Sequence, residues 1–247
     1  MAGATGFIGA RLATSLAGRG SSVRCLVRDR SKARALEAAG LDLHRGDIDD
    51  AESLIYLGGL GDESTSKHLS SRHQTARVLA AEGPPLTYFR AAMVVGAGSE
   101  SYRALRYLVG RLPVMIAPAW LQTSTQPIGI DAAIEYLRLA PTVPESTGQE
   151  VQIGGPDVIS YSEMMDRMAI ALEKRPRRKL PVPFITPWLS ALWLGLVTPV
   201  DVKVARPLVE GLTTATVVTD PAGAEPFGIS PESFDEALRR ALAAEQS

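Results

Sequence analysis

A glycine triplet near the start of the chain has the spacing of a phosphate-binding turn. The segment reads Gly3-Ala4-Thr5-Gly6-Phe7-Ile8-Gly9, and an apolar-periodic helical segment follows it. In such a turn Gly3 allows the tight bend, Gly6 lets the backbone approach a pyrophosphate, and Gly9 permits close helix packing. The free N–H groups of the helix N-terminus would bind the phosphates of a dinucleotide. We expect cofactor contacts here at Gly3, Thr5, Gly6, Phe7 and Ile8.

The residues after the next predicted strand indicate which dinucleotide binds. An acidic side chain at this point holds the ribose 2′-OH of NAD, whereas an arginine accommodates the 2′-phosphate of NADP. Arg28 comes directly after the strand, and Arg30 and Lys32 are close by. We therefore favour NADP and list Arg28 as a cofactor contact, while Asp29 leaves NAD open. The alternative is that these charges are solvated residues flanking a helix.

A further candidate loop, Gly46-Asp47-Ile48, follows another predicted strand. Asp47 has an acceptor for the adenine amino group, and Ile48 has an apolar side chain to line the ring. Both are therefore candidate cofactor contacts. The alternative role for Asp47 is that of a turn or helix cap.

The elements that must position these residues alternate between helix and strand. Apolar spacing predicts a helix over 8–17, a strand over 22–27, a helix over 32–39 and a strand over 41–44. Later strands are predicted at 55–60, 86–95, 114–116 and 150–153, and later helices at 68–81, 102–111, 131–139 and 160–173. Asp131 is expected to cap one of these helices, and Ser160 with Glu163 forms a capping box on another.

This alternation predicts an α/β fold, a Rossmann-like doubly wound parallel sheet with a small C-terminal substrate region. We place the nucleotide-binding part at 1–113 and a C-terminal substrate or interaction region, packed on it, at 114–247.

Composition excludes several function classes. The 247 residues carry a net charge of −1 and are 45% hydrophobic, which argues against a nucleic-acid binder and against a disordered chain. The single cysteine, Cys25, cannot form an internal disulfide, and no signal peptide is recognised, so we expect a cytoplasmic protein. The three histidines lack cysteine or carboxylate partners at ligand spacing, so we expect no metal site.

Several segments resemble the atypical or extended short-chain dehydrogenase/reductases, in the NmrA-like NAD(P)-binding group. The segments that carry the resemblance are 3–9, 26–29, 46–48, 56–61, 89–92, 126–128 and 153–156. The tail to Ser247 is similar to a bacterial subgroup of nucleoside-diphosphate-sugar-epimerase-like proteins. The resemblance implies a Rossmann fold, a bound nicotinamide dinucleotide and an oxidoreductase or epimerase acting on an unknown small substrate.

The chain departs from this family at its catalytic signature, Tyr-x-x-x-Lys, in which tyrosine exchanges a proton with the substrate oxygen. None of the six tyrosines has a lysine four residues later; Tyr102 and Tyr107 are followed by Arg106 and Arg111. The predicted helix over 68–81 has no tyrosine, although His73 occupies a lysine-like position. The catalytic residues therefore stay unassigned. The alternatives are a non-catalytic NAD(P)-sensing or interaction protein, and a damaged paralogue that binds no nucleotide well.

The nucleotide-binding half also lacks segments that a complete sheet requires. Only Met1 and Ala2 precede Gly3, where the family has a buried strand of about five or six residues. Glu52-Ser53-Leu54 has the pattern of a helix start and runs directly into the predicted strand at Ile55. Parallel strands need a connection of roughly a dozen residues or more, so we predict that a strand–helix stretch is missing there.

A basic run over 174–179 precedes an apolar segment over 184–200 that contains two tryptophans. The segment is interrupted by prolines and is too short for a membrane-spanning helix of about 20 apolar residues. A buried or interface helix is the favoured interpretation. Contact of residues 174–200 with a membrane surface is the alternative.

Overall fold

The first elements follow the predicted order of helix, strand, helix and strand. The computed structural model describes residues 3–26, 33–44, 52–61, 67–111, 114–181 and 212–246. Its first four elements are α1 (Phe7–Gly18), β1 (Arg24–Leu26), α2 (Arg34–Ala38) and β2 (Asp42–His44). The two strands pair in parallel, with Cys25 opposite Leu43, and both side chains lie in a small apolar cluster beneath α1 and α2.

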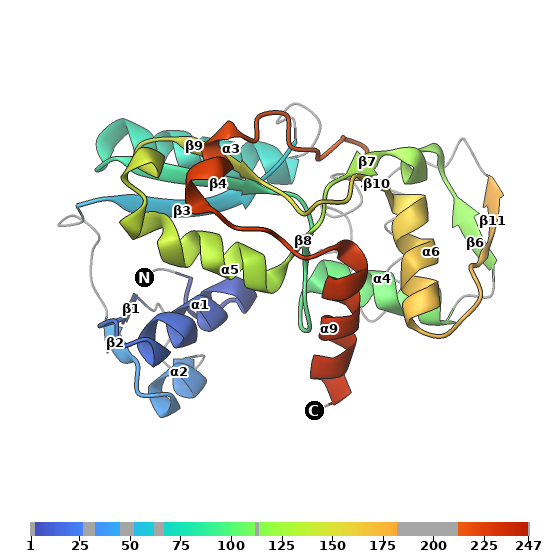
Figure 1. The fold of residues 1–247 in the computed structure, drawn as a ribbon, viewed down its shortest axis with the longest axis horizontal. Coiled ribbons are helices and arrows are strands. Elements are labelled where there is room, and N and C mark those ends of the chain that lie inside the picture. The colour runs from blue at the N-terminus through green and yellow to red at the C-terminus, as the bar shows by residue number, and fades with distance from the viewer. Residues whose placement is uncertain are drawn as a thin grey trace.

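A second parallel sheet lies between two helices. Its strands, in spatial order, are β3 (Leu54–Gly59), β4 (Leu86–Ala91) and β9 (Glu150–Ile153). Figure 1 shows α3 (Lys67–Glu82) on one face of this sheet and α5 (Ile130–Leu139) on the other. Because β9 comes from the C-terminal half of the chain, that half contributes a strand to the same sheet as β3 and β4. The division of the chain at residue 113 stays a prediction.

The remaining elements form a neighbouring lobe and the connections to it. Three further strand pairs are parallel β5 (Val94–Val95) with β8 (Ile128–Gly129), parallel β6 (Val114–Ala117) with β11 (Arg178–Pro181), and antiparallel β7 (Ser124–Thr125) with β10 (Ile159–Ser160). The helices are α4 (Glu100–Arg111), α6 (Tyr161–Ala171) and α9 (Phe234–Gln246), with short 3-10 turns η2 (Ala119–Gln122), η3 (Ala140–Thr142), η4 (Pro144–Ser146) and η5 (Ala222–Phe227). Residues of α4, α6 and α9 share one apolar core.

The described residues contain no strand that joins the β1–β2 pair to the β3–β4–β9 sheet, and none precedes α1 within 3–26. The missing strands stay a prediction, because residues 1–2, 27–32 and 45–51 lie outside the described part of the chain. α1 packs on α5: Ile8 and Leu12 lie against the apolar cluster that contains Ala133 and Tyr136. Figure 1 shows the two helices side by side.

Three local predictions are wrong. Leu54 does not belong to a helix start; it is the first residue of β3, and its N–H donates to the carbonyl oxygen of Pro85 at 2.9 Å. Asp131 does not cap α5, because Gly129 holds the N-cap position and Asp131 instead forms an ion pair with Arg240 of α9.

The third concerns the strand predicted over 86–95, which is two strands. β4 ends at Ala91, and β5 begins at Val94 and pairs with β8. The capping box, by contrast, is confirmed: the Glu163 N–H donates to Ser160 Oγ at 3.1 Å, and the Glu163 carboxylate accepts from the Ser160 N–H at 2.8 Å. No helix in the described part of the chain has the length and apolarity to span a bilayer.

Candidate functional site

The glycine turn has a backbone conformation that depends on its glycines. Gly3 has a φ of +76°, which L side chains rarely adopt, and the Gly6 N–H donates to the Gly3 carbonyl oxygen at 2.9 Å. Gly6 is the N-cap of α1 and no side chain caps it. The N–H groups of the first helical turn therefore lack intrahelical acceptors, and that turn has no acidic residue to repel an anion.

Gly9 leaves no room for a side chain. A Cβ built on Gly9 would lie 2.0 Å from the carbonyl oxygen of Gly3 and 2.7 Å from its carbon. The close approach is therefore between the helix and the turn's own backbone, rather than between the helix and a sheet. Any larger residue at this position would push the turn away from the helix terminus.

Two side chains attach the turn to the loop after β5. The Arg11 guanidinium donates to the Ala97 carbonyl oxygen at 3.0 Å and lies over the Phe7 ring, 4.5 Å from its centroid. The Phe7 ring also fills the space beside Gly96 and Gly98. Of the predicted cofactor contacts, Phe7 and Ile8 thus direct their side chains into protein packing. Their backbone N–H groups are what remains for a ligand.

The structure brings together Gly3, Thr5, Gly6, Phe7 and Ile8 in one turn, with Thr5 exposed. The other predicted cofactor contacts, Arg28, Asp47 and Ile48, lie outside the described residues. Their roles stay predictions.

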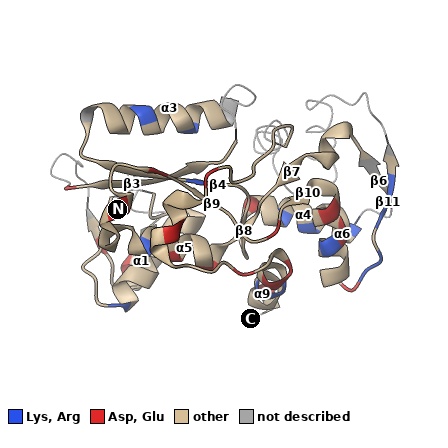
Figure 2. Cartoon of the chain, turned by 45° about the horizontal axis from the view of Figure 1, so that its top comes forward, with Lys and Arg blue, Asp and Glu red and all other residues tan. Residues whose placement is uncertain are grey.

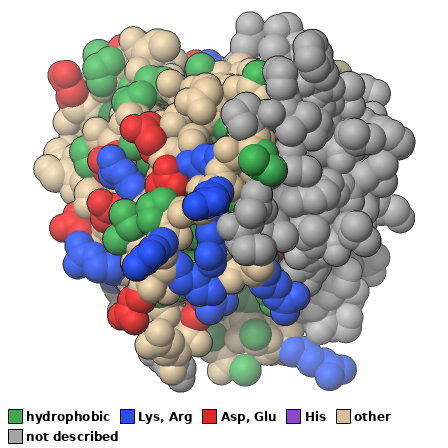
Figure 3. Space-filling model, turned by 90° about the vertical axis from the view of Figure 1, so that its right-hand side faces the viewer, with side chains coloured by type: hydrophobic (Ala, Val, Ile, Leu, Met, Phe, Trp, Pro, Cys, Tyr) green, Lys and Arg blue, Asp and Glu red, His purple; other side chains and the backbone are tan. Residues whose placement is uncertain are grey.

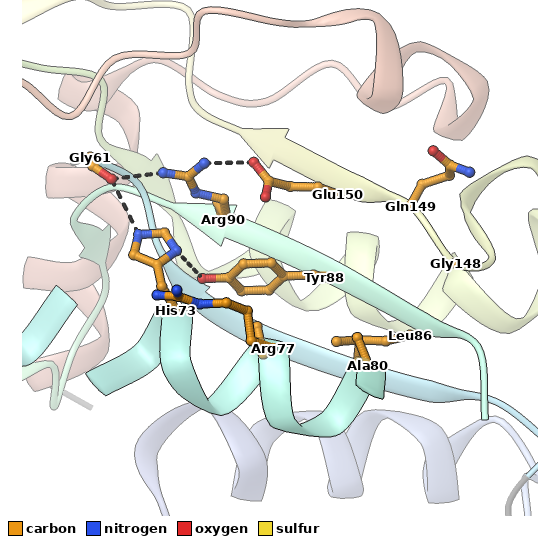
Figure 4. Close-up of a pocket in the computed structure, with 11 residues that line it drawn as sticks. Gly61, His73, Arg77, Ala80, Leu86, Tyr88, Arg90, Gly148, Gln149 and Glu150 are labelled. Carbon is orange, nitrogen blue, oxygen red and sulfur yellow. Dashed lines mark hydrogen bonds and ion pairs between the residues drawn. The ribbon is translucent and has the colours of Figure 1, made fainter. Parts of the chain in front are cut away.

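A second group of polar residues lines a pocket of about 500 Å³ between α3, β4 and the start of β9. His73 of α3 has Nδ1 at 3.0 Å from the Tyr88 hydroxyl and Nε2 at 3.2 Å from the Gly61 carbonyl oxygen. A carbonyl only accepts, so we assign the proton to Nε2, and the Tyr88 hydroxyl then donates to Nδ1. Figure 4 shows this chain of contacts along one side of the pocket.

Arg90 holds the same carbonyl from the other side. Its guanidinium donates to the Gly61 oxygen at 2.7 Å and forms an ion pair with Glu150 of β9. Gly61 lies two residues after the end of β3 and has a φ of +114°. Its carbonyl is therefore fixed by two side chains from different elements, His73 of α3 and Arg90 of β4.

Tyr88 is not an activated acid. Burial raises its pKa from 10.0 to about 12, and nearby Arg90 offsets this only in part. The short-chain dehydrogenase signature requires the opposite shift, a tyrosine whose pKa is lowered by a cation. Tyr88 lies on a strand and His73 on a helix, 15 positions apart in the chain. The Tyr-x-x-x-Lys spacing within one helix therefore could not predict this pair. The detectable signal was the alternation of Leu86, Tyr88 and Arg90 on one strand face.

Tyr102 and Arg106, which have the spacing of the tyrosine–lysine signature, have a structural role. Tyr102 is fully buried in the core of the second lobe, and its hydroxyl donates to the Glu245 carboxylate at 3.3 Å. Arg106 pairs with the same carboxylate. Burial raises the pKa of Tyr102, and its side chain has no exposed surface from which to meet a substrate.

Part of the basic run also has a structural role. Lys174 Nζ donates to the Gly110 carbonyl oxygen at 2.6 Å, and Arg177 Nε donates to that of Val109 at 3.0 Å. These carbonyls end α4, where cations are favoured by the helix dipole. Figure 2 shows basic residues along α4, α6 and β11, and Figure 3 shows them gathered on that side of the molecule. Residues 182–200 lie outside the described part, and membrane contact stays a prediction.

Comparison with known proteins gives one family match and a set of structures with the same fold. Residues 3–56 match a family model described as NAD(P)H-binding. No curated protein sequence matches the chain. The solved structures that match it confirm the predicted Rossmann-like α/β fold, and the family match confirms that residues 3–56 resemble NAD(P)H-binding proteins.

Three of these structures illustrate the likeness. An NADPH-dependent quinone oxidoreductase from Escherichia coli is 16% identical, with a TM-score of 0.74 over 100% of this chain and 98% of that one; the same enzyme is also known complexed with NADPH. A nucleoside-diphosphate-sugar epimerase from Staphylococcus aureus is 13% identical, with a TM-score of 0.73 over 96% and 98%. A triphenylmethane reductase from Citrobacter is 12% identical, with a TM-score of 0.73 over 98% of both chains.

Replacing Gly9 tests the glycine turn. We expect Gly9→Ala to destabilise the fold by roughly 1–3 kcal/mol and to abolish dinucleotide binding, because the added methyl overlaps the Gly3 carbonyl. Gly18→Ala is the matched control in the same helix, since a Cβ there meets nothing within 4 Å. Urea unfolding and NADPH calorimetry measure both effects. Unchanged NADPH affinity in a folded Gly9→Ala protein would contradict the assignment.

The pKa of Tyr88 predicts an alkaline loss of stability. Since its folded-state pKa of about 12 exceeds the ordinary 10.0, its stabilising contribution is complete below pH 10.0 and is lost as pH rises toward about 12. We expect Tyr88→Phe to lose less of its free energy of unfolding across this range than the wild type does. Other buried tyrosines with raised pKa, such as Tyr136 and Tyr161, keep some of the loss in the variant. Parallel pH profiles for the two proteins would show that Tyr88 titrates normally.

Proposed function

We propose that the protein binds a nicotinamide dinucleotide through the turn at Gly3–Gly9. The observation that carries the proposal is the turn itself: a positive φ at Gly3, no space at Gly9, and a helix N-terminus with uncapped N–H groups. Such a terminus stabilises the negative charge of a pyrophosphate. The match of residues 3–56 to the NAD(P)H-binding model supports the same ligand class.

Within this ligand class we propose NADP(H) as the preferred form. β1 ends at Leu26, so Arg28 follows its carboxyl end by two residues, where a guanidinium meets the ribose 2′-phosphate. Arg30 and Lys32 add positive charge nearby, whereas Asp29 is the residue that would favour NAD.

For the reaction, we propose hydride transfer from the nicotinamide to an electron-poor conjugated acceptor. The sequence has no Tyr-x-x-x-Lys pair, so a substrate that needs a protein acid is disfavoured. A quinone takes the hydride from the nicotinamide C4 and acquires its proton from water, which gives hydroquinone and oxidised cofactor. Quinones and triphenylmethane dyes are named as substrates of two structural neighbours.

Two alternative functions remain for a protein that binds NAD(P): an epimerase, which fits the sequence less well, and a non-catalytic protein, which fits it equally well. An epimerase must remove a proton from a substrate hydroxyl as the hydride leaves, which requires a base, and the sequence has no Tyr-x-x-x-Lys pair to supply it. A non-catalytic NAD(P)-sensing or interaction protein requires only the turn, and the missing tyrosine–lysine pair favours it.

Reversing the charge at Arg28 tests the cofactor preference. We expect Arg28→Asp to weaken NADPH binding by about tenfold or more and to leave NADH affinity nearly unchanged, because only NADPH carries the 2′-phosphate. Arg19→Asp, at the opposite end of α1, is the control and should affect neither ligand. Calorimetric titration measures both. Equal losses for NADPH and NADH, or none, would refute the NADP assignment.

Turnover separates a reductase from a sensor. We expect NADPH oxidation with a naphthoquinone and none with a simple aliphatic ketone, because only the quinone needs no protein acid. The decrease in NADPH absorbance is measured against product formation, with Gly9→Ala as the control for specific catalysis. Tight NADPH binding without quinone reduction would exclude the reductase and favour the sensing function. Efficient ketone reduction would show that an acid is present and would contradict the proposed mechanism.

A further inference from the structure

A group of basic side chains surrounds the C-terminal end of α4. Lys174 and Arg177 donate to the carbonyl oxygens of Gly110 and Val109, in the last turn of that helix, and Arg111 is its last residue. Together with the exposed residues directly beside them in the chain, these side chains form a basic patch: Arg111, Lys174, Arg175, Arg177 and Arg178. Figure 3 shows Lys and Arg side chains gathered on this side of the molecule.

Carboxylates do not neutralise the basic patch. Two of its members bind main-chain carbonyls, which carry no net charge, and Arg111 lies over the Tyr107 ring, 5.0 Å from its centroid. None of the five forms an ion pair with an acidic residue in the described part of the chain, and Glu173 is an exposed carboxylate beside them. Neighbouring cations have carboxylate partners of their own: Arg103, Arg106 and Lys179. Because the whole chain carries a net charge of −1, the patch is a local excess of positive charge.

Exposed aliphatic side chains border the basic patch. Lys179 points toward α6, where its Nζ lies 2.6 Å from the Asp166 carboxylate, so alternation along β11 puts Arg178 and Leu180 on the opposite face. Leu180 is 57% exposed, and Ile170, one helical turn beyond Asp166, is 64% exposed. The surface therefore combines uncompensated positive charge with apolar side chains that a purely charged partner would not contact.

We propose that the basic patch docks the protein on the surface of a bilayer that contains anionic lipids. Such a surface supplies the opposite charge, and each basic residue held near it raises the affinity about fivefold. Leu180 and Ile170 enter the boundary between headgroups and acyl chains, an apolar layer that an acidic protein surface does not offer. The net negative charge of the chain disfavours a nucleic acid. The proposal does not depend on dinucleotide binding.

Vesicle sedimentation tests the lipid requirement. We expect the full chain to bind vesicles of phosphatidylcholine with roughly one-third phosphatidylserine, and to bind vesicles of phosphatidylcholine alone about tenfold more weakly or less. Raising the salt from about 0.1 M to about 1 M shortens the Debye length from roughly 10 Å to 3 Å and should release most of the bound protein. Equal binding to the two kinds of vesicle, or no binding to the anionic ones, would overturn the proposal.

A double charge reversal locates the surface. Arg175→Glu with Arg178→Glu changes two exposed side chains and should weaken binding to the anionic vesicles by roughly a hundredfold. Arg19→Glu with Arg239→Glu makes the same change in total charge at exposed positions of α1 and α9, and should leave the affinity nearly unchanged. Urea unfolding confirms that both variants are folded. Equal losses in the two variants would show that only the total charge matters, which would refute the assignment to this patch.

The aliphatic side chains separate a bilayer from an acidic protein partner. Leu180→Ser with Ile170→Ser should weaken vesicle binding about tenfold, because two apolar side chains lose their contact with the acyl boundary, and should leave binding to poly-glutamate unchanged. Val78→Ser, at a 61% exposed position of α3, is the control and should not change vesicle binding. Unchanged vesicle binding in the double serine variant, with tighter binding to poly-glutamate than to vesicles, would identify an acidic protein as the partner and overturn the bilayer.

Discussion

The packing of α1 on α5 is the contact on which the position of the glycine turn depends. A Rossmann phosphate turn normally stands on a central buried strand, and within the described residues no strand precedes α1. Here Ile8 and Leu12 rest on the cluster that contains Tyr136 of α5. Arg11 and Phe7 attach the start of the helix to the loop after β5. The glycine turn is therefore positioned by helix packing and one guanidinium–carbonyl bond.

The main sheet serves two purposes at its two faces. On the α5 face it supports α1 and hence the turn. On the α3 face Gly58 has no Cβ, and the Tyr88 ring occupies the space that a side chain there would need. The carbonyl of Gly61, just beyond the end of β3, is held by His73 and Arg90.

Four of the six tyrosines of this chain belong to its packed interior. Tyr88, Tyr102, Tyr136 and Tyr161 are buried, and burial raises the pKa of each. A buried phenol of this kind stabilises the core and donates a hydrogen bond, but it is a poor proton donor to substrate near neutral pH. Hydride transfer to an acceptor that needs no protein acid is compatible with such a chain. Nucleotide sensing is compatible with it as well.

The sequence by itself determined the local features. The glycine spacing, the helix and strand order of the first 44 residues and the capping box at Ser160 were all readable, because each depends on residues close together in the chain. Tertiary structure decided the rest. Asp131 pairs with Arg240 instead of capping, and His73 meets Tyr88 across a helix and a strand. Contacts between residues 15 or 109 positions apart arise only when packing brings two elements together, and no local spacing encodes them.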